Sequence, residues 1–247
     1  SGLLSFAISF LIKHPDVVAR AQEEVDRVLG TDTSLLPTYQ QVQGLTYINQ
    51  ILSETLRLWP TVAAFTRYPY QDSMVGPYLM PKGSSITGMT IMLHRDKSVW
   101  GADAEEYNPD HFRPETRSQL PPNAFKPFGS GQRACIGRQF AMQEAMLVLG
   151  MLLQRFEFVD YLNYELKIKE GLTIKPDGLL IKIKLRPGRT TGTAPIAIAS
   201  APTNGQAAEP KARPQRTGEG HNTPLMVLFG SNLGTAEGIA SRIAQDG

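Results

Sequence analysis

Apolar residues recur at helical spacing in four stretches of the chain. Residues 1–12 are apolar almost throughout, and residues 15–29 carry an apolar position at every third or fourth residue. Residues 45–59 have the same stripe, whereas residues 137–156 are apolar nearly all round. A stripe that repeats every 3.6 residues is typical of a helix packed on a core, and a helix that is apolar on all sides is typical of the centre of a large domain. The pattern therefore predicts four core helices.

Short strands and turns replace the helical pattern between and after these stretches. Residues 60–93 read as short strands separated by Pro- and Gly-containing turns, and residues 94–134 are irregular. Residues 167–174 and 179–185 flank the turn sequence Pro176-Asp177-Gly178, which predicts a β-hairpin between them. We therefore expect a mainly α domain with small β-sheets.

The character of the chain changes twice towards its end. Residues 187–222 contain Ala, Thr, Pro, Gly and charged residues but no aromatic residue and hardly any periodicity, which predicts a disordered linker. Residues 225–229 then form a short buried-type strand, followed by a glycine-bearing turn and a helix from about Glu237. The expected organisation is a domain over residues 1–186, the linker, and the opening of an α/β domain over residues 223–247.

Composition narrows the class of protein. The 247 residues are 41% hydrophobic and 19% charged, which is typical of a globular protein that can bury a core. The net charge of +2 gives no indication of a nucleic-acid partner, so we expect none. A single cysteine excludes a disulfide framework within the chain and fits a reducing compartment. No basic segment precedes the first apolar run, so it does not resemble a signal peptide, and it is shorter than the ~20 residues of a spanning helix. We expect a buried core helix whose beginning is cut off. Because the chain also stops directly after a helical pattern, we expect a fragment at both ends.

The single cysteine, Cys135, lies in a glycine-rich loop directly before the fourth predicted helix. Residues 128–137 read FGSGQRACIG, and the three glycines allow positive φ angles and a close approach of the backbone to a flat ligand. The positive end of the following helix favours a thiolate at Cys135, and Arg133 adds a cation for an anionic group of the same ligand. Taken alone, a lone cysteine beside an apolar helix is more often an inert core residue. The surrounding residues favour a ligand.

The pattern Phe-x-x-Gly-x-Arg-x-Cys-x-Gly resembles the haem-ligand signature of the cytochrome P450 family. Every defined position is filled, by Phe128, Gly131, Arg133, Cys135 and Gly137. The resemblance implies the C-terminal half of the P450 fold and a haem b whose iron is bound by the Cys135 thiolate, a ligand that favours O–O cleavage. It also implies that Arg133 pairs with a haem propionate, that Phe128 shields the sulfur, and that backbone N–H groups tune its donation.

Glu54 and Arg57 form an i, i+3 pair on the third predicted helix. The pattern places them away from the apolar stripe, which by itself predicts a solvated surface pair. In the P450 family, the matching Glu-x-x-Arg pair is buried and joins a third residue from the segment before the cysteine loop. The matching segment here, residues 107–112, has His111 where the family usually has arginine, with Arg113 as the neighbouring alternative. The resemblance implies a structural network whose third arm has a pH-dependent charge.

An apolar stretch follows the third predicted helix, at Val62, Ala63, Ala64 and Phe65. The resemblance implies that these four residues line the substrate pocket, whereas without the family they read equally well as an apolar turn in a core. The acid–alcohol pair that manages protons in the family is expected upstream of Ser1. No catalytic residue is therefore assigned within the chain.

The glycine-bearing turn near the end of the chain follows a strand and opens a helix. Such a turn gathers N–H groups around an anion, although it lacks the lysine of a Walker A loop and the spacing of a dinucleotide fingerprint. On these grounds a phosphate site and a tight βα turn are equally open. The sequence of this turn resembles the FMN-phosphate loop of flavodoxin-like reductase domains. The resemblance implies that the phosphate is held by Ser231, Asn232, Gly234, Thr235 and Ala236.

The order of the three segments resembles the self-sufficient fusions of a P450 with its reductase, the bacterial and fungal fatty-acid hydroxylases. In both, a haem-thiolate segment is followed by a linker and then by the opening of a flavodoxin-like domain. The resemblance implies that electrons pass from NADPH through FAD and FMN of a reductase in cis. One atom of O₂ is then inserted into a small hydrophobic substrate such as a fatty acid. Two alternatives stay open: a haem-thiolate isomerase or dehydratase, and a non-catalytic haem-binding module. We expect the fragment itself to be inactive and its parent to be cytoplasmic, with peripheral membrane attachment left open.

Overall fold

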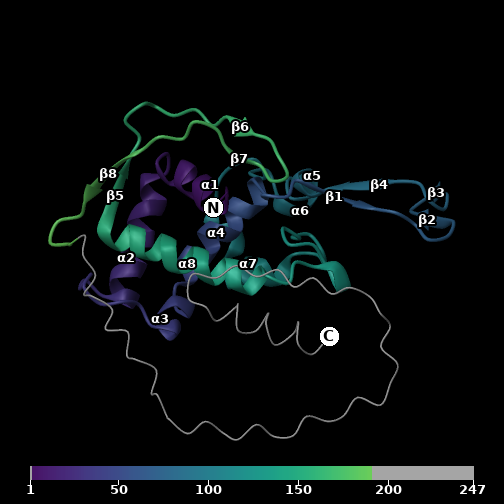
Figure 1. Cartoon of the computed structure of the whole chain (residues 1–247). Helices are drawn as coiled ribbons and strands as arrows, with labels where there is room; N and C mark the ends of the chain where they lie inside the picture. The colour runs from purple at the N-terminus through teal and green to yellow at the C-terminus, as the bar shows by residue number, and fades with distance from the viewer. Residues whose placement is uncertain (1, 191–247) are drawn as a thin grey trace, which may run out of the picture. The chain divides into compact units, whose positions relative to one another are not determined.

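The computed structural model describes residues 2–190, which belong to one unit of the chain, residues 1–197. Four helices form its centre and confirm the four predicted ones: α1 (Gly2–Leu11), α2 (Pro15–Leu29), α4 (Thr46–Leu58) and α8 (Arg138–Arg155). α8 runs below α1 and α4 in Figure 1, and both α2 and α4 pack on it. Fully buried core residues include Leu45, Ile48, Ile51, Leu52, Leu149 and Leu153.

The first two helices meet at a sharp break. Phe6, Ala7 and Leu11 are buried, which confirms that α1 is a core helix. Pro15 suits the first turn of α2 because the N–H that it lacks would have no partner there, and Gly30, with φ at 82°, ends the helix. Among residues 2–190, no helix taken singly has the length and apolar character for a membrane span; only α1 and α2 together do, as a pair bent by 114°.

The start of α4 is stabilised from another helix. Leu45 occupies the N-cap position and has no side-chain oxygen that could accept from the first N–H groups. The carboxylate of Glu24 in α2 replaces it, because it accepts from Tyr47 N at 2.8 Å and from Ile48 N at 3.0 Å. It also accepts from the hydroxyl of Thr46 at 2.8 Å. A negative charge at a helix N-terminus satisfies free donors and complements the helix dipole, so Glu24 ties α2 to α4.

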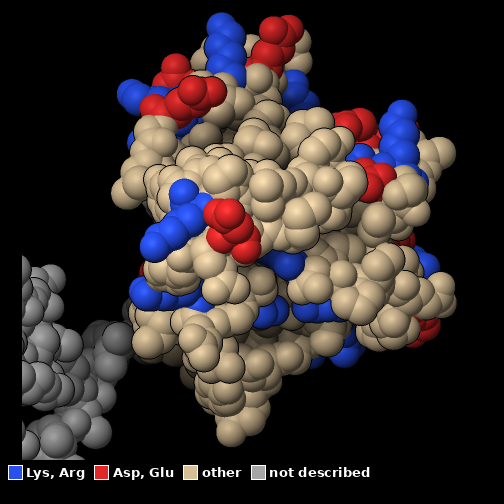
Figure 2. All heavy atoms as spheres, turned by 90° about the vertical axis from the view of Figure 1, so that its right-hand side faces the viewer, with Lys and Arg blue, Asp and Glu red and all other residues tan. Residues whose placement is uncertain are grey.

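Within residues 2–190, four small antiparallel sheets lie around the helices. An arm to the right in Figure 1 holds two of them: β1 (Ala64–Arg67) with β4 (Ile86–Met89), and β2 (Ser73–Val75) with β3 (Tyr78–Met80). Viewed from that side, the surface is mostly uncharged (Figure 2), and Tyr70, Met74, Tyr78 and Leu79 are exposed on the arm. The other two sheets pair β5 (Phe156–Val159) with β8 (Lys182–Leu185), and β6 (Ile168–Lys169) with β7 (Lys175–Pro176).

The predicted hairpin between residues 167–174 and 179–185 is wrong. β8 pairs with β5, which continues directly from α8, and a shorter hairpin, β6–β7, forms within residues 168–176. The pairing of β8 with β5 is stabilised by a residue that follows β8. The guanidinium of Arg186 donates to the carbonyl of Leu153 at 2.9 Å and pairs with Asp26 of α2 at 2.7 Å, which holds β8 beside the end of α8.

The domain extends further than the sequence predicted. Arg189, within the expected linker, donates to the carbonyl of Thr31 at 2.8 Å and pairs with Asp26 at 2.9 Å. Thr190 N donates to the hydroxyl of Thr33 at 3.1 Å. Residues 187–190 are therefore part of the packed domain. The rest of the predicted linker and the predicted flavodoxin-like opening lie outside the described residues.

Within residues 2–190, short helices lie in the segments where the sequence predicted a loop, short strands or irregular structure. They are α3 (Tyr39–Gln43), α5 (Thr90–Leu93), α6 (Lys97–Trp100), α7 (Pro114–Gln119) and two 3₁₀ turns, η1 (Pro109–Phe112) and η2 (Gly131–Arg133). A second, smaller core of Trp100, Ala104 and Phe112, with Phe125 packed against it, anchors this region. The segment is thus fixed in space although its sequence has little periodicity.

Candidate functional site

Cys135 lies on a tight loop that ends where α8 begins. Gly129 and Gly131 have φ angles of +73° and +68°, in the left-handed region that other residues rarely adopt. The loop closes on itself because Cys135 N donates to the carbonyl of Phe128 at 2.9 Å, and Ala134 N donates to that of Gly131 at 3.1 Å. The thiol is exposed, and Arg138 opens the helix three residues later, so the predicted place of Cys135 beside a helix N-terminus is confirmed.

The surroundings of Cys135 fit a haem. Ile136 and Phe140 are 104% and 73% exposed, so apolar surface for a flat apolar ring flanks the thiol. Arg133 has no carboxylate partner among residues 2–190, which leaves its charge available to a haem propionate. Within the same residues, no group of three or more His, Cys, Asp or Glu side chains could hold a metal ion. A haem needs no such group, because the porphyrin itself surrounds the iron and the protein adds an axial ligand.

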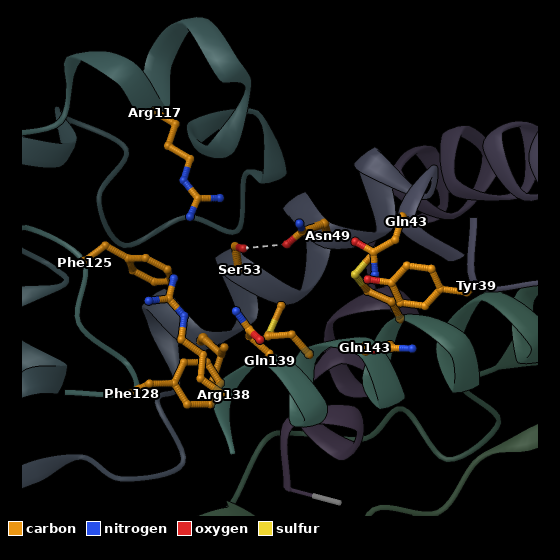
Figure 3. Close-up of a pocket in the computed structure, with 13 residues that line it drawn as sticks. Tyr39, Gln43, Asn49, Ser53, Arg117, Phe125, Phe128, Arg138, Gln139 and Gln143 are labelled. Carbon is orange, nitrogen blue, oxygen red and sulfur yellow. Dashed lines mark hydrogen bonds between the residues drawn. The ribbon is translucent and has the colours of Figure 1, made fainter. Parts of the chain in front are cut away.

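A polar cavity of about 350 Å³ lies between α3, α4, α7 and the start of α8, and Phe128 forms part of its wall. Figure 3 shows the guanidinium groups of Arg117 and Arg138 reaching into it from opposite sides. Arg138 lies over the Phe128 ring at 6.0 Å. No Asp or Glu lines the cavity, and burial together with the charge of Arg138 lowers the pKa of Arg117. The cavity therefore favours an anionic group over a cationic one.

Glu54 and Arg57 are completely buried, so the surface pair that the pattern alone predicted is wrong and the burial that the resemblance implied is found. Arg57 binds the carboxylate with two hydrogen bonds, of 2.8 Å from Nε and 2.7 Å from Nη2. Its remaining donors reach the carbonyls of His94, Ala104 and Glu106. The segment around residue 100 covers this face of α4, and its carbonyls satisfy the guanidinium. A buried ion pair is tolerated only with such complete pairing.

His111 provides the third arm of this network. Its Nδ1 lies 3.1 Å from Glu54 Oε1, and its Nε2 lies 3.1 Å from Asp103 Oδ2. Burial and the charge of Arg57 lower the pKa of His111, but the hydrogen bond and charge of Glu54 and the hydrogen bond of Asp103 prevail, so the pKa is raised. Each ring nitrogen faces a carboxylate oxygen, which accepts, so the charged ring can donate to both partners. The alternative, Arg113, is wrong because it pairs with Asp110 at 2.6 Å.

Sequence reasoning assigned no role to Asp103 or to His94, although the segment from His94 to Gly101 resembles the P450 family. Asp103 lies in a polar loop, where a carboxylate is common and indicates no particular role. His94 lies in a segment without helical or strand periodicity. His94 is completely buried, and its Nε2 accepts from Lys126 N at 2.8 Å. Neither contact is made by residues that are neighbours in one helix or strand, so periodicity could not indicate it.

The remaining predicted site residues are placed only in part. Val62 is 47% exposed, Ala63 is half-buried, and Ala64 and Phe65 open β1, where the Phe65 ring packs under Gly88. Their role in a substrate pocket stays a prediction. The predicted FMN-phosphate residues, Ser231, Asn232, Gly234, Thr235 and Ala236, lie outside the described residues.

Comparison with known proteins agrees with this site. Residues 1–183 match the family model for cytochrome P450. The chain is 51% identical, over its full length, to a bifunctional cytochrome P450/NADPH–P450 reductase of Bacillus subtilis, and 48% identical over 99% of its length to one of Bacillus cereus. It is 42% identical over its full length to a self-sufficient cytochrome P450 monooxygenase of Exserohilum turcicum. The chain spans 22–24% of the length of these relatives. With its only cysteine on the haem-ligand loop of that family, the chain belongs to the cytochrome P450 family.

Proposed function

We propose that the chain is part of a haem-thiolate monooxygenase that receives electrons from NADPH through a fused reductase containing FAD and FMN. The overall reaction is RH + O₂ + NADPH + H⁺ → ROH + H₂O + NADP⁺. The observation that carries the proposal is the exposed Cys135 thiol on a glycine loop at the start of α8. The names of the relatives, which join a P450 to an NADPH-dependent reductase, support the source of electrons.

The residues of this chain hold and orient the haem rather than react. A bound haem supplies oxygen activation, which thiolate ligation favours. The sulfur of Cys135 would bind the iron, and the start of α8 would stabilise its negative charge. Arg133 would bind a propionate, and the buried Glu54–Arg57–His111 network keeps the segment before the loop in place. The cavity beside Phe128 adds positive charge on the side of α4 and α8.

We extend the proposal to a fatty acid as substrate, with Val62, Ala63, Ala64 and Phe65 in its pocket, and to a cytoplasmic parent protein. Ser231, Asn232, Gly234, Thr235 and Ala236 would bind the FMN phosphate. Incubation of the full-length protein with long-chain fatty acids and NADPH tests the substrate. Hydroxylated fatty acid formed only with NADPH is expected, and its absence at every chain length would contradict the substrate assignment.

The iron ligand is tested by Cys135→Ala in the full-length protein. We expect loss of the ferrous–CO Soret band of thiolate-ligated haem and of NADPH-dependent product, because no second thiol is present in this chain. Ser130→Ala serves as the control, since this exposed loop residue makes no side-chain cap hydrogen bond. A Soret band that stays in place in Cys135→Ala would show that the ligand is another group.

A further inference from the structure

We infer that His94 is a positioning residue for the thiolate loop, because its imidazole fixes the backbone of Lys126 and, through it, the turn that carries Cys135. The inference rests on the proposed haem-thiolate function. His94 belongs to the segment before the buried network, far from Cys135 in sequence. Its effect on the sulfur would therefore be exerted through hydrogen bonds rather than direct contact.

Three hydrogen bonds lead from His94 to the cysteine. Lys126 N donates to His94 Nε2 at 2.8 Å, and Gly129 N donates to the carbonyl of Lys126 at 3.1 Å. Cys135 N then donates to the carbonyl of Phe128 at 2.9 Å. Proline at position 127 has no N–H group, so the N–H of Lys126 is the last backbone donor before Phe128. His94 thus binds the final available donor ahead of the loop.

His94 is itself held firmly. It is completely buried, and its carbonyl accepts from Nη1 of Arg57 at 3.0 Å. Its ring packs against that of Phe125, with centroids 5.1 Å apart. Phe125 belongs to the second core and, together with Phe128, lines the cavity drawn in Figure 3. His94 therefore joins the buried ion pair of α4, through its carbonyl, to the backbone segment that enters the cysteine loop, through its ring.

The protonation state of His94 follows from its partner. Because Nε2 accepts from an N–H group, it carries a lone pair, and the single proton of the neutral ring lies on Nδ1. Burial lowers the pKa of His94 to about 4, and the nearby backbone of Leu56 and Arg57 opposes this only in part, without a hydrogen bond of normal geometry to the ring. Nδ1 has no hydrogen-bond partner among residues 2–190. The acceptor is therefore available throughout the neutral pH range.

The test uses His94→Leu, His94→Gln and His94→Asn in the full-length, haem-loaded protein. Leucine removes the acceptor. The amide oxygen of glutamine reaches the place of Nε2, whereas that of asparagine reaches only the place of Nδ1. The readouts are the ferrous–CO Soret band and the reduction potential of the haem, measured on protein whose circular dichroism shows it to be folded. A purely structural role would lower stability without changing either readout in the folded protein.

We expect His94→Leu and His94→Asn to raise the ratio of non-thiolate to thiolate ferrous–CO form about fivefold, as the loss of one hydrogen bond predicts. Both variants should also shift the reduction potential, and His94→Gln should restore both readouts. His14→Leu is the matched control, because within residues 2–190 the ring of His14 makes one hydrogen bond, with the carbonyl of Phe10 in α1. Unchanged spectra and potentials in folded His94→Leu, or equal values for His94→Gln and His94→Asn, would overturn the inference.

The ferrous–CO spectrum of the wild-type protein distinguishes failure of the proposed function from failure of this inference. A wild-type protein without the thiolate band contradicts the proposed function, whereas a wild-type band with unaffected His94 variants contradicts only this inference. If the variants do not fold, hydrogen exchange of the wild type decides. The peptide that contains Lys126 should exchange slowly, and rapid exchange of its amide would contradict the role of His94.

Discussion

At the scale of single residues, His111 stands where the P450 family usually has arginine. An arginine keeps its charge at every physiological pH, whereas the charge of a histidine depends on its surroundings. Here the two carboxylates of Glu54 and Asp103 stabilise the charged ring on both sides, while Arg57 and burial oppose it. The substitution therefore preserves the third arm of the network but makes its strength depend on pH.

The stability of the haem domain should consequently fall as the pH rises. The pKa of His111 is raised above 6.5, so the folded protein holds this proton more tightly than the unfolded chain does. The stabilisation is fully present below pH 6.5 and is lost as the pH rises through the raised pKa. Urea unfolding of the full-length protein, followed by haem absorbance between about pH 6 and about pH 9, measures the effect. His111→Arg should remove this slope; an equal slope in both proteins would show that another group causes it.

Glu54→Gln should be among the most damaging single substitutions in this domain. It leaves the buried guanidinium of Arg57 and the charged ring of His111 without their shared partner, at a cost of about 3–5 kcal/mol. Glu105→Gln is the matched control, because the side chain of Glu105 is 61% exposed in its pair with Arg95. Its cost should stay below about 1 kcal/mol. Equal urea midpoints for the two variants would contradict the structural role of Glu54.

At the scale of elements, α4 depends on a residue outside itself. Its N-terminal N–H groups are satisfied by Glu24 of α2, and its C-terminal half holds the Glu54–Arg57 pair. Helix packing alone would fix how far apart α2 and α4 lie. The carboxylate also fixes where α4 begins along α2, and so where the buried ion pair meets the segment that leads to the cysteine loop.

Glu24→Gln should lower the free energy of unfolding by about 1–3 kcal/mol. The amide keeps one oxygen but turns an N–H₂ group towards the N–H groups of α4 and loses the charge that complements the helix dipole. Glu23→Gln, at the exposed neighbouring position, changes the same groups without this contact and should leave stability almost unaltered. Urea midpoints of the two variants that agree within error would contradict the capping role.

At the scale of the whole molecule, this chain exposes much apolar surface for its size. Ile136 and Phe140 flank the cysteine, and aromatic and aliphatic residues cover the arm formed by β1 to β4. Uncovered apolar patches of this kind mark surfaces that are normally in contact with a ligand or with protein. The relatives that the chain resembles are about four times longer, since it spans 22–24% of their length.

Residues 1–247 alone should bind haem weakly. One face of the porphyrin would meet the Cys135 loop, while the exposure of Ile136 and Phe140 leaves the ring edge open to water, so little apolar area is buried on binding. Haem titration of this chain, with the full-length parent as the control, measures the difference in Kd. A soluble 1:1 complex with a normal thiolate ferrous–CO band would contradict the expectation.

Local patterns were enough to predict much of this protein. Four helices follow from apolar spacing, because a helix is formed by contacts between residues three and four apart, which the sequence states directly. The cysteine loop follows from glycines and a thiol that lie within residues 128–137. Positive φ angles at Gly129 and Gly131 and the start of α8 after Cys135 agree with what those residues predict.

Tertiary structure alone decided the contacts between distant segments. Nothing in the local pattern around Arg57 indicates that the carbonyls of His94 and Glu106 accept from it, nor that His94 accepts from Lys126 N. β8 pairs with β5, and the domain extends to residue 190, because Asp26 binds Arg186 and Arg189. Burial turns a pair of charges from a solvated surface feature into a structural centre, and burial depends on which segments the fold brings together. Periodicity along the chain does not indicate which distant segments will pack together.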